Sequence, residues 1–174
     1  MITLIDYGVG NIFAFQNVYK RLDIPTKIAK TSEDLSVAKK LILPGVGSFD
    51  YAMGQLIASG MREKLDELVL EKKVPVIGIC VGMQMMGNRS DEGELGGLKW
   101  IDAEILKFDE RLIQHRTKLP HMGWNDVNPV EDHPLFIGLE KEAIFYFLHS
   151  FYGQLIFLLL FLSLSLHLRE KNYY

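Results

Sequence analysis

Apolar and polar positions follow two different periods along the first half of this chain. Short apolar runs predict four strands, at residues 2–5, 26–30, 39–44 and 74–80. Apolar residues that recur every three or four positions predict helices at 12–22 and 49–73, the second with a break near Ser59. Strands that alternate with helices favour an α/β fold, with an open, mostly parallel sheet and helices on both faces. The run at 74–80 is apolar on both faces, so we expect it to be a central strand.

The second half of the chain has a different pattern. Residues 103–108, 124–130 and 143–152 predict strands of a mixed or antiparallel region. Residues 155–168 form an uncharged run rich in leucine, phenylalanine and serine. As a helix this run spans only about 21 Å, less than the roughly 30 Å of a bilayer's hydrocarbon core, so it does not predict a membrane span. We expect one domain over residues 1–152 and an aberrant leucine-rich tail over 153–174.

Composition narrows the class of protein. A chain of 174 residues suits one domain, and its net charge of −3 provides no basic surface for nucleic acid or an anionic membrane. The single cysteine, Cys80, cannot form an internal disulfide, which indicates a reducing, cytoplasmic setting. The spacing of this cysteine and the five histidines does not suggest a metal site, and no cofactor is predicted.

Cys80 stands where the fourth apolar run gives way to small residues. Gly78-Ile79-Cys80-Val81-Gly82 has the G-x-nucleophile-x-G form of a nucleophile elbow, with cysteine in place of serine. In such an elbow the following helix favours the thiolate, and the Val81 amide can donate to an oxyanion. A lone cysteine in an apolar strand is more often a small buried side chain. The two glycines favour the elbow instead, and with it acyl transfer through a thioester.

A glycine-rich turn follows the third apolar run. Gly45, Val46 and Gly47 lie in "LPGVGSF", where backbone N–H groups can point at an anion. We expect the turn either to complete an oxyanion hole or to hold a substrate carboxylate. A tight turn without a function is the alternative for this stretch taken alone. A phosphate loop is disfavoured because no G-K-[ST] follows.

Several stretches together resemble one family. "PGVGSF", "GICVGMQ" and "LPHMGWN" are similar to motifs of the glutamine amidotransferase subunits of imidazole glycerol phosphate synthase, and "DYGVGN" and "YFLHSFY" fit the same family. The resemblance runs from residue 1 to about residue 152. It implies a flavodoxin-like class I glutamine amidotransferase domain that hydrolyses glutamine. It also implies that ammonia passes to a (β/α)₈-barrel cyclase subunit, which forms imidazole glycerol phosphate for histidine biosynthesis.

The resemblance implies roles for individual residues. Cys80 matches the nucleophile, Gly47 lies in the loop of the oxyanion region, and Gln84 and Glu92 match positions near bound glutamine. A second set matches the segment and the strand at the partner-facing surface: His121, Met122, Trp124, Asn125 and His149.

The end of the chain departs from the family pattern. The family's general base lies after the "HSFY" strand in a Q-F-H-P-E motif, whereas the only later histidine here is His167, without the glutamate. We therefore expect impaired catalysis and a C-terminal part that is missing or altered. A shifted reading frame after Gly153, or a truncated copy, is a hypothesis for the tail. His115 and His133 are expected to be structural histidines.

Two alternatives to this interpretation stay open at the level of sequence. The chain can be a paralogue that supplies ammonia to a sugar-modifying amidotransferase, because no residue identifies the ammonia acceptor. It can also be an inactive truncated product that binds its partner through "PHMGWN".

Overall fold

The computed structural model describes residues 1–113, 118–127, 137–139 and 144–155. These residues belong to two compact units. The first contains Met1–Leu106 with residues 153–155, and the second contains the described residues of Lys107–Tyr152. The predictions made for His115, His133, His167 and the leucine-rich tail from residue 156 lie outside the described residues.

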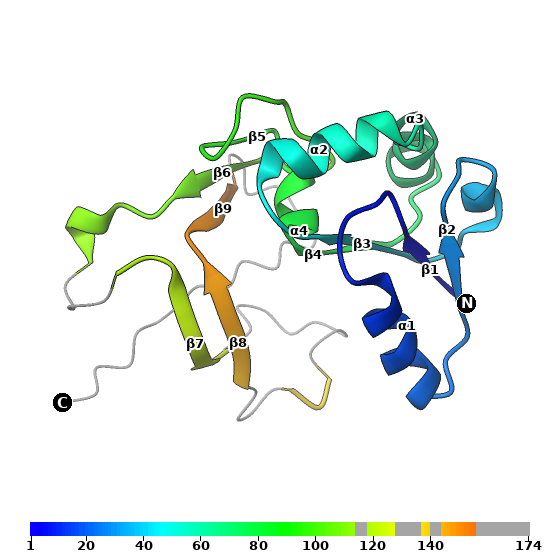
Figure 1. The fold of residues 1–174 in the computed structure, drawn as a ribbon, viewed down its shortest axis with the longest axis horizontal. Coiled ribbons are helices and arrows are strands. Elements are labelled where there is room, and N and C mark those ends of the chain that lie inside the picture. Colours follow the sequence, from blue (N-terminus) through cyan, green and yellow to red (C-terminus); the bar gives the residue numbers. More distant parts are fainter. Residues whose placement is uncertain (114–117, 128–136, 140–143, 156–174) are drawn as a thin grey trace. The chain divides into compact units, whose positions relative to one another are not determined.

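The first unit contains a parallel sheet of four strands (Figure 1). Its members are β1 (Ile2–Ile5), β2 (Thr26–Ala29), β3 (Leu41–Gly45) and β4 (Val76–Cys80). They lie in the order β2-β1-β3-β4, and every neighbouring pair is parallel. The predicted α/β fold with a parallel sheet is confirmed.

Helices pack on both faces of this sheet. They are α1 (Ile12–Arg21), α2 (Phe49–Ala58), α3 (Arg62–Asp66) and the π-helical turn η2 (Glu67–Glu71), together with the 3₁₀ turn η1 (Asp34–Val37). Successive strand residues point to opposite faces. Leu4 therefore packs in the cluster on the α1 face, and Ile5 packs in the cluster with α2 and α3. Among the described residues, no helix is both long and apolar enough to cross a membrane.

The position of β4 differs from the prediction. Among the described residues β4 pairs with β3 alone, so it is an edge strand rather than a central one. Its Ile77 is 45% exposed. Two apolar faces suit a strand to burial, but a strand is central only where a second segment pairs with its other edge. The prediction of a central strand is therefore wrong for the described structure.

Shorter elements complete the two units. In the first unit, α4 (Val81–Met85) follows β4, and β5 (Arg89–Ser90) follows α4. A small sheet has the strand order β5-β6-β9, with β6 at Ala103–Lys107 and β9 at Phe151–Leu155. The second unit has the 3₁₀ turn η3 (Glu110–Leu112) and the antiparallel pair β7 (His121–Asp126) and β8 (Ile144–His149). The single strand predicted at 143–152 is thus two strands, separated by a bend at Ser150.

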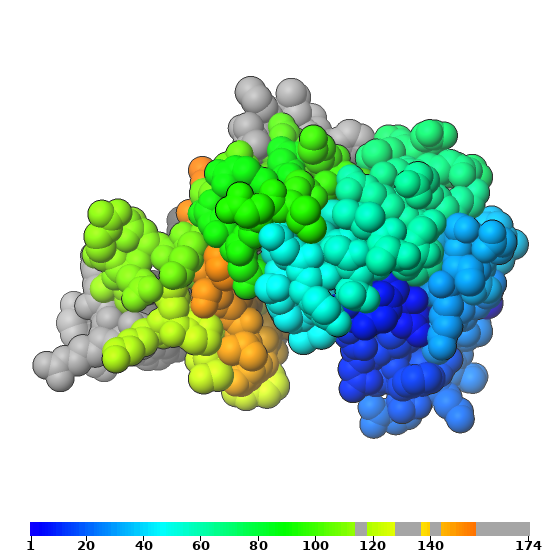
Figure 2. All heavy atoms as spheres, turned by 45° about the horizontal axis from the view of Figure 1, so that its top comes forward, coloured from blue at the N-terminus to red at the C-terminus, as the bar shows by residue number. Residues whose placement is uncertain are grey.

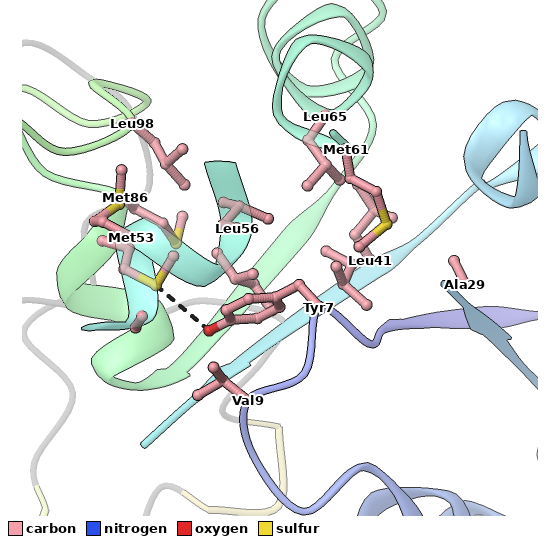
Figure 3. Close-up of a cluster of buried hydrophobic side chains, with 14 of the residues drawn as sticks. Tyr7, Val9, Ala29, Leu41, Met53, Leu56, Met61, Leu65, Met86 and Leu98 are labelled. Carbon is pink, nitrogen blue, oxygen red and sulfur yellow. Dashed lines mark hydrogen bonds between the residues drawn. The ribbon is translucent and has the colours of Figure 1, made fainter. Parts of the chain in front are cut away.

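The larger core lies between the sheet and α2, α3 and α4 (Figure 3). Tyr7 enters this core from the loop after β1 and is only 3% exposed. Its hydroxyl donates to the Pro44 carbonyl oxygen at 2.7 Å and lies 3.5 Å from the Met85 sulfur (Figure 3, dashed line). One buried side chain therefore connects the end of β3 with α4.

We expect Gly82→Ala to destabilise the first unit by at least about 2 kcal/mol, because the new Cβ overlaps the Leu43 carbonyl group and forces β3 and α4 apart. Gly54→Ala is the matched control. Gly54 lies inside α2 with no atom near its missing Cβ, so alanine there should stabilise by about 0.5–1 kcal/mol. Urea unfolding followed by circular dichroism measures both values. Equal stability of the two variants would contradict the close contact.

Candidate active site

Cys80 is the last residue of β4 and the residue before α4. Its backbone has φ 55° and ψ −122°, a conformation that residues other than glycine rarely adopt. Strain of this kind amounts to about 1–3 kcal/mol and persists only where the surrounding structure imposes it. Cys80 is exposed. The structure thus contains the strand-to-helix elbow that the sequence predicts, with an accessible thiol.

Glycines make this elbow possible. A Cβ at Gly78 would overlap the backbone of Met83, and a Cβ at Gly82 would overlap the carbonyl group of Leu43. A Cβ at Gly45 would in turn overlap the backbone at Gly82. Backbone segments on both sides of Cys80 therefore lie in direct contact with other backbone, with no side chain between them. These contacts are the physical reason for glycine at both ends of the G-x-C-x-G pattern.

The turn at Gly45, Val46 and Gly47 lies beside the elbow. Gly45 is the register partner of Cys80 in the pairing of β3 with β4. Gly47 has φ 85°, and Val46 is 57% exposed. The turn and the thiol thus share the carboxyl edge of a parallel sheet, where ligands bind in open α/β folds. Val81 follows Cys80 in the chain and Gly45 lies opposite it in the register, so the N–H groups of Val81 and of this turn are candidate donors beside the thiol.

Gln84 and Glu92 lie in the same unit and differ in their contacts. Gln84, on α4, is 6% exposed, and its Oε1 is the one buried side-chain nitrogen or oxygen in the described part of the chain without a hydrogen-bond partner. An oxygen in that state costs about 1–3 kcal/mol unless another group supplies a donor. Glu92 is engaged, because its Oε2 accepts from the Phe49 N–H at 2.8 Å, in the first turn of α2. Glu92 therefore contacts the helix that follows the glycine-rich turn.

The histidines of the predicted partner-facing set form a network in the second unit. His121 Nδ1 and His149 Nε2 lie 2.9 Å apart, and Asn125 Nδ2 lies 3.0 Å from His121 Nε2. His149 Nδ1 lies 2.8 Å from the Phe151 carbonyl oxygen. A carbonyl can only accept, so we assign the proton to His149 Nδ1, and each neutral ring then accepts at Nε2 from the group before it. Hydrogen bonds thus run in one direction from Asn125 to Phe151.

Met122 and Trp124 lie on the opposite face of the β7–β8 pair. They are 62% and 71% exposed, and their register partners Leu148 and Tyr146 are exposed as well. Trp124 meets Tyr146 edge to face, with ring centroids 5.4 Å apart. The pair therefore has a polar histidine face and an exposed apolar face.

Sequence reasoning did not single out two residues that support the site. Tyr7 holds the Pro44 carbonyl just before the glycine-rich turn, and burial raises the pKa of its hydroxyl. Asp50 binds two backbone N–H groups of a distant segment. Tyr7 stands in the glycine-rich stretch "DYGVGN", which the sequence already marks as a turn. Asp50 lies in a predicted helix, and no local pattern distinguishes it from other polar residues there. In the described part of the chain, no three His, Cys, Asp or Glu side chains come together as metal ligands.

Comparison with known proteins identifies the class of this protein. Residues 3–159 match the family model "Glutamine amidotransferase class-I". The chain therefore belongs to the class I glutamine amidotransferase family. A solved "Crystal structure of glutamine amidotransferase" superposes with a TM-score of 0.59 and 19% identity, covering 74% of this chain and 64% of that one, which supports the fold alone.

More similar relatives carry the name "Imidazole glycerol phosphate synthase subunit HisH". The protein from Bdellovibrio bacteriovorus is 57% identical over 154 residues, which cover 88% of this chain and 76% of the relative. The protein from Leptospira interrogans is 47% identical over 154 residues, with the same coverage of both chains. "HisH 2" of Pseudomonas aeruginosa is 47% identical over 152 residues, or 87% of this chain and 74% of the relative.

We expect the β7–β8 pair to lose stability in acid. Burial lowers the pKa of His121 from its ordinary 6.5, and the neighbouring His149 lowers it further. The unfolded state then binds more protons than the folded state, so this contribution is present above about pH 6.5 and is lost as the pH falls through the folded pKa. Hydrogen exchange of the β7 amides, corrected for intrinsic rates, measures this loss. His121→Gln should flatten the profile, and an unchanged profile in that variant would contradict the assignment.

Proposed function

We propose that this chain hydrolyses glutamine to glutamate and ammonia as the glutaminase subunit of an imidazole glycerol phosphate synthase. One observation carries the proposal: the exposed thiol of Cys80 lies at a strained elbow beside the turn at residues 45–47, in a member of a glutamine amidotransferase family. The names of the relatives at 40–57% identity support the choice of synthase.

The chemistry follows from the groups at this edge of the sheet. The Cys80 thiolate attacks the carboxamide carbon of glutamine, and the carbonyl oxygen becomes an oxyanion that the N–H groups of Val81 and of the turn at 45–47 can bind. The amide nitrogen takes up the proton that the Cys80 thiol lost, the C–N bond breaks, ammonia leaves, and a thioester remains. Water attacks the thioester and releases glutamate and the thiol. We propose that Gln84 and Glu92 lie near the bound glutamine, the unpartnered Gln84 oxygen being free to accept from it.

The second unit supplies the proposed partner surface. We propose that ammonia passes to a cyclase subunit with a (β/α)₈ barrel, bound by the set His121, Met122, Trp124, Asn125 and His149. The exposed Met122 and Trp124 offer apolar area for such a contact. Use of an unpaired cysteine as nucleophile fits a reducing compartment, so we propose a cytoplasmic location.

Both steps of this chemistry also need a general base. Residues 1–106, which carry Cys80, include no histidine. The same observation favours a second candidate function, in which the chain binds its synthase partner without sustained turnover. Under this candidate the second unit keeps its role, and Cys80 reacts with glutamine once or slowly.

We expect a diazo-ketone analogue of glutamine to modify Cys80 covalently. The elbow exposes the sulfur, and the adjacent turn can bind the carbonyl oxygen of the analogue. Peptide mass spectrometry locates the label. Cys80→Ser, nearly equal in size, is the control and should stay unlabelled. Label on other residues of the folded protein, with Cys80 unmodified, would count against the elbow as the reactive site.

We expect steady-state glutamate formation by the 174-residue chain with a cyclase subunit to be at least about 10²-fold slower than that of the Bdellovibrio relative with the same subunit. General base assistance is typically worth 10²–10⁴-fold, and the thioester needs a base to activate water. A rate equal to the relative's, and abolished by His167→Ala, would show that the tail supplies the base.

A further inference from the structure

The segment of residues 92–101, which follows β5, makes hydrogen bonds to both α2 and the end of α4. Both helices begin at the candidate site. Residues 92–95 contact the first turn of α2 through hydrogen bonds. Figure 2 shows the green part of the chain, which includes these residues, beside the cyan part, which includes α2. The backbone N–H groups of residues 97–101 donate to carbonyl oxygens of residues 85–88, at the end of α4 and just beyond it. α2 begins after the turn at 45–47, and α4 begins directly after Cys80. The segment is therefore hydrogen-bonded to both α2 and the end of α4, and the first residues of these two helices flank the site.

Asp50, in the first turn of α2, holds this segment with both carboxylate oxygens. Oδ2 accepts from the Glu94 N–H at 2.9 Å, and Oδ1 accepts from the Leu95 N–H at 3.0 Å. A Cβ at Gly93 would overlap the Asp50 carboxylate, so this approach requires glycine at that position. Hydrogen bonds to an ionised acceptor are stronger than neutral ones, and a negative charge also suits the first turn of a helix.

Glu92 makes the reciprocal contact. Its Oε2 accepts from the Phe49 N–H at 2.8 Å, and its own N–H donates to Ser90 Oγ at 3.1 Å. The Asp50 carboxylate of the helix thus accepts from N–H groups of the segment, and the Glu92 carboxylate of the segment accepts from an N–H group of the helix. Phe49 is fully buried, so the start of α2 cannot move without disturbing the core. These two contacts fix the geometry of the residues that come directly after the glycine-rich turn.

We infer that Asp50 is a positioning residue for glutamine hydrolysis, which holds Glu92 and the turn at residues 45–47 in place relative to Cys80. This inference rests on the proposed function. The elbow itself does not need Asp50, because the register of β3 with β4 and the glycine contacts hold Cys80. Loss of Asp50 should therefore loosen the groups that bind the substrate and leave the thiol as it is.

Two reagents on the full chain separate these effects. The diazo-ketone analogue of glutamine needs the binding groups and the oxyanion donors, whereas iodoacetamide needs only an accessible thiol. We expect Asp50→Asn to slow labelling of Cys80 by the analogue roughly 10- to 100-fold, because small displacements of positioning groups have effects of that size. Its rate with iodoacetamide should equal that of the unaltered chain.

Asp66→Asn is the matched control, because Asp66 holds the far end of the same segment by accepting from Trp100 Nε1 at 2.6 Å. It should leave both labelling rates unchanged. Gly93→Ala displaces the Asp50 carboxylate by a different route and should reproduce the Asp50→Asn result, and the double variant should add little. Analogue rates for Asp50→Asn and Gly93→Ala equal to that of the unaltered chain would overturn the inference and leave the proposed function standing. So would an equal slowing with iodoacetamide. Failure of the analogue to label the unaltered chain would overturn the proposed function itself.

Discussion

The direct backbone contact between the end of β3 and the first turn of α4 governs the arrangement of the candidate site. Gly45 and Gly82 meet there without side chains between them, and Gly82 also lies against the Leu43 carbonyl. This contact, together with the register that pairs Gly45 with Cys80, brings the glycine-rich turn beside the thiol. A single methyl group at either glycine would separate the donors from the nucleophile. The chemistry at this edge therefore depends on the lack of a Cβ atom at Gly45 and at Gly82.

Sequence periodicity predicted the local parts of this structure well and the pairing of distant segments less well. The four parallel strands and the elbow at Cys80 depend on short-range patterns, namely apolar runs and small residues at a turn. The place of β4 at the edge of the sheet depends on which segment pairs with its second edge, and no local pattern records that. The bend at Ser150 likewise divides a run whose alternation is nearly continuous in the sequence.

The site shows the same division between local and distant information. Cys80 and the turn at 45–47 were predicted from motifs of five to seven residues. Glu92 was assigned only by resemblance, and its contact with Phe49 crosses 43 positions of the chain. The pairing of His121 with His149 crosses 28 positions and follows from the register of β7 with β8. Contacts of this range depend on how the strands assemble, so one sequence read alone does not predict them.

The positive φ of Cys80 means that cysteine is not the residue that makes this fold most stable at position 80. Glycine is the residue that adopts such a conformation at little cost, and replacing Cys80 with glycine would relieve strain of about 1–3 kcal/mol while removing the sulfur. Stability and reactivity thus impose opposite demands on one residue. Selecting variants of this chain for thermal stability alone would therefore tend to eliminate its only thiol, and any such selection has to be coupled to a readout of sulfur chemistry.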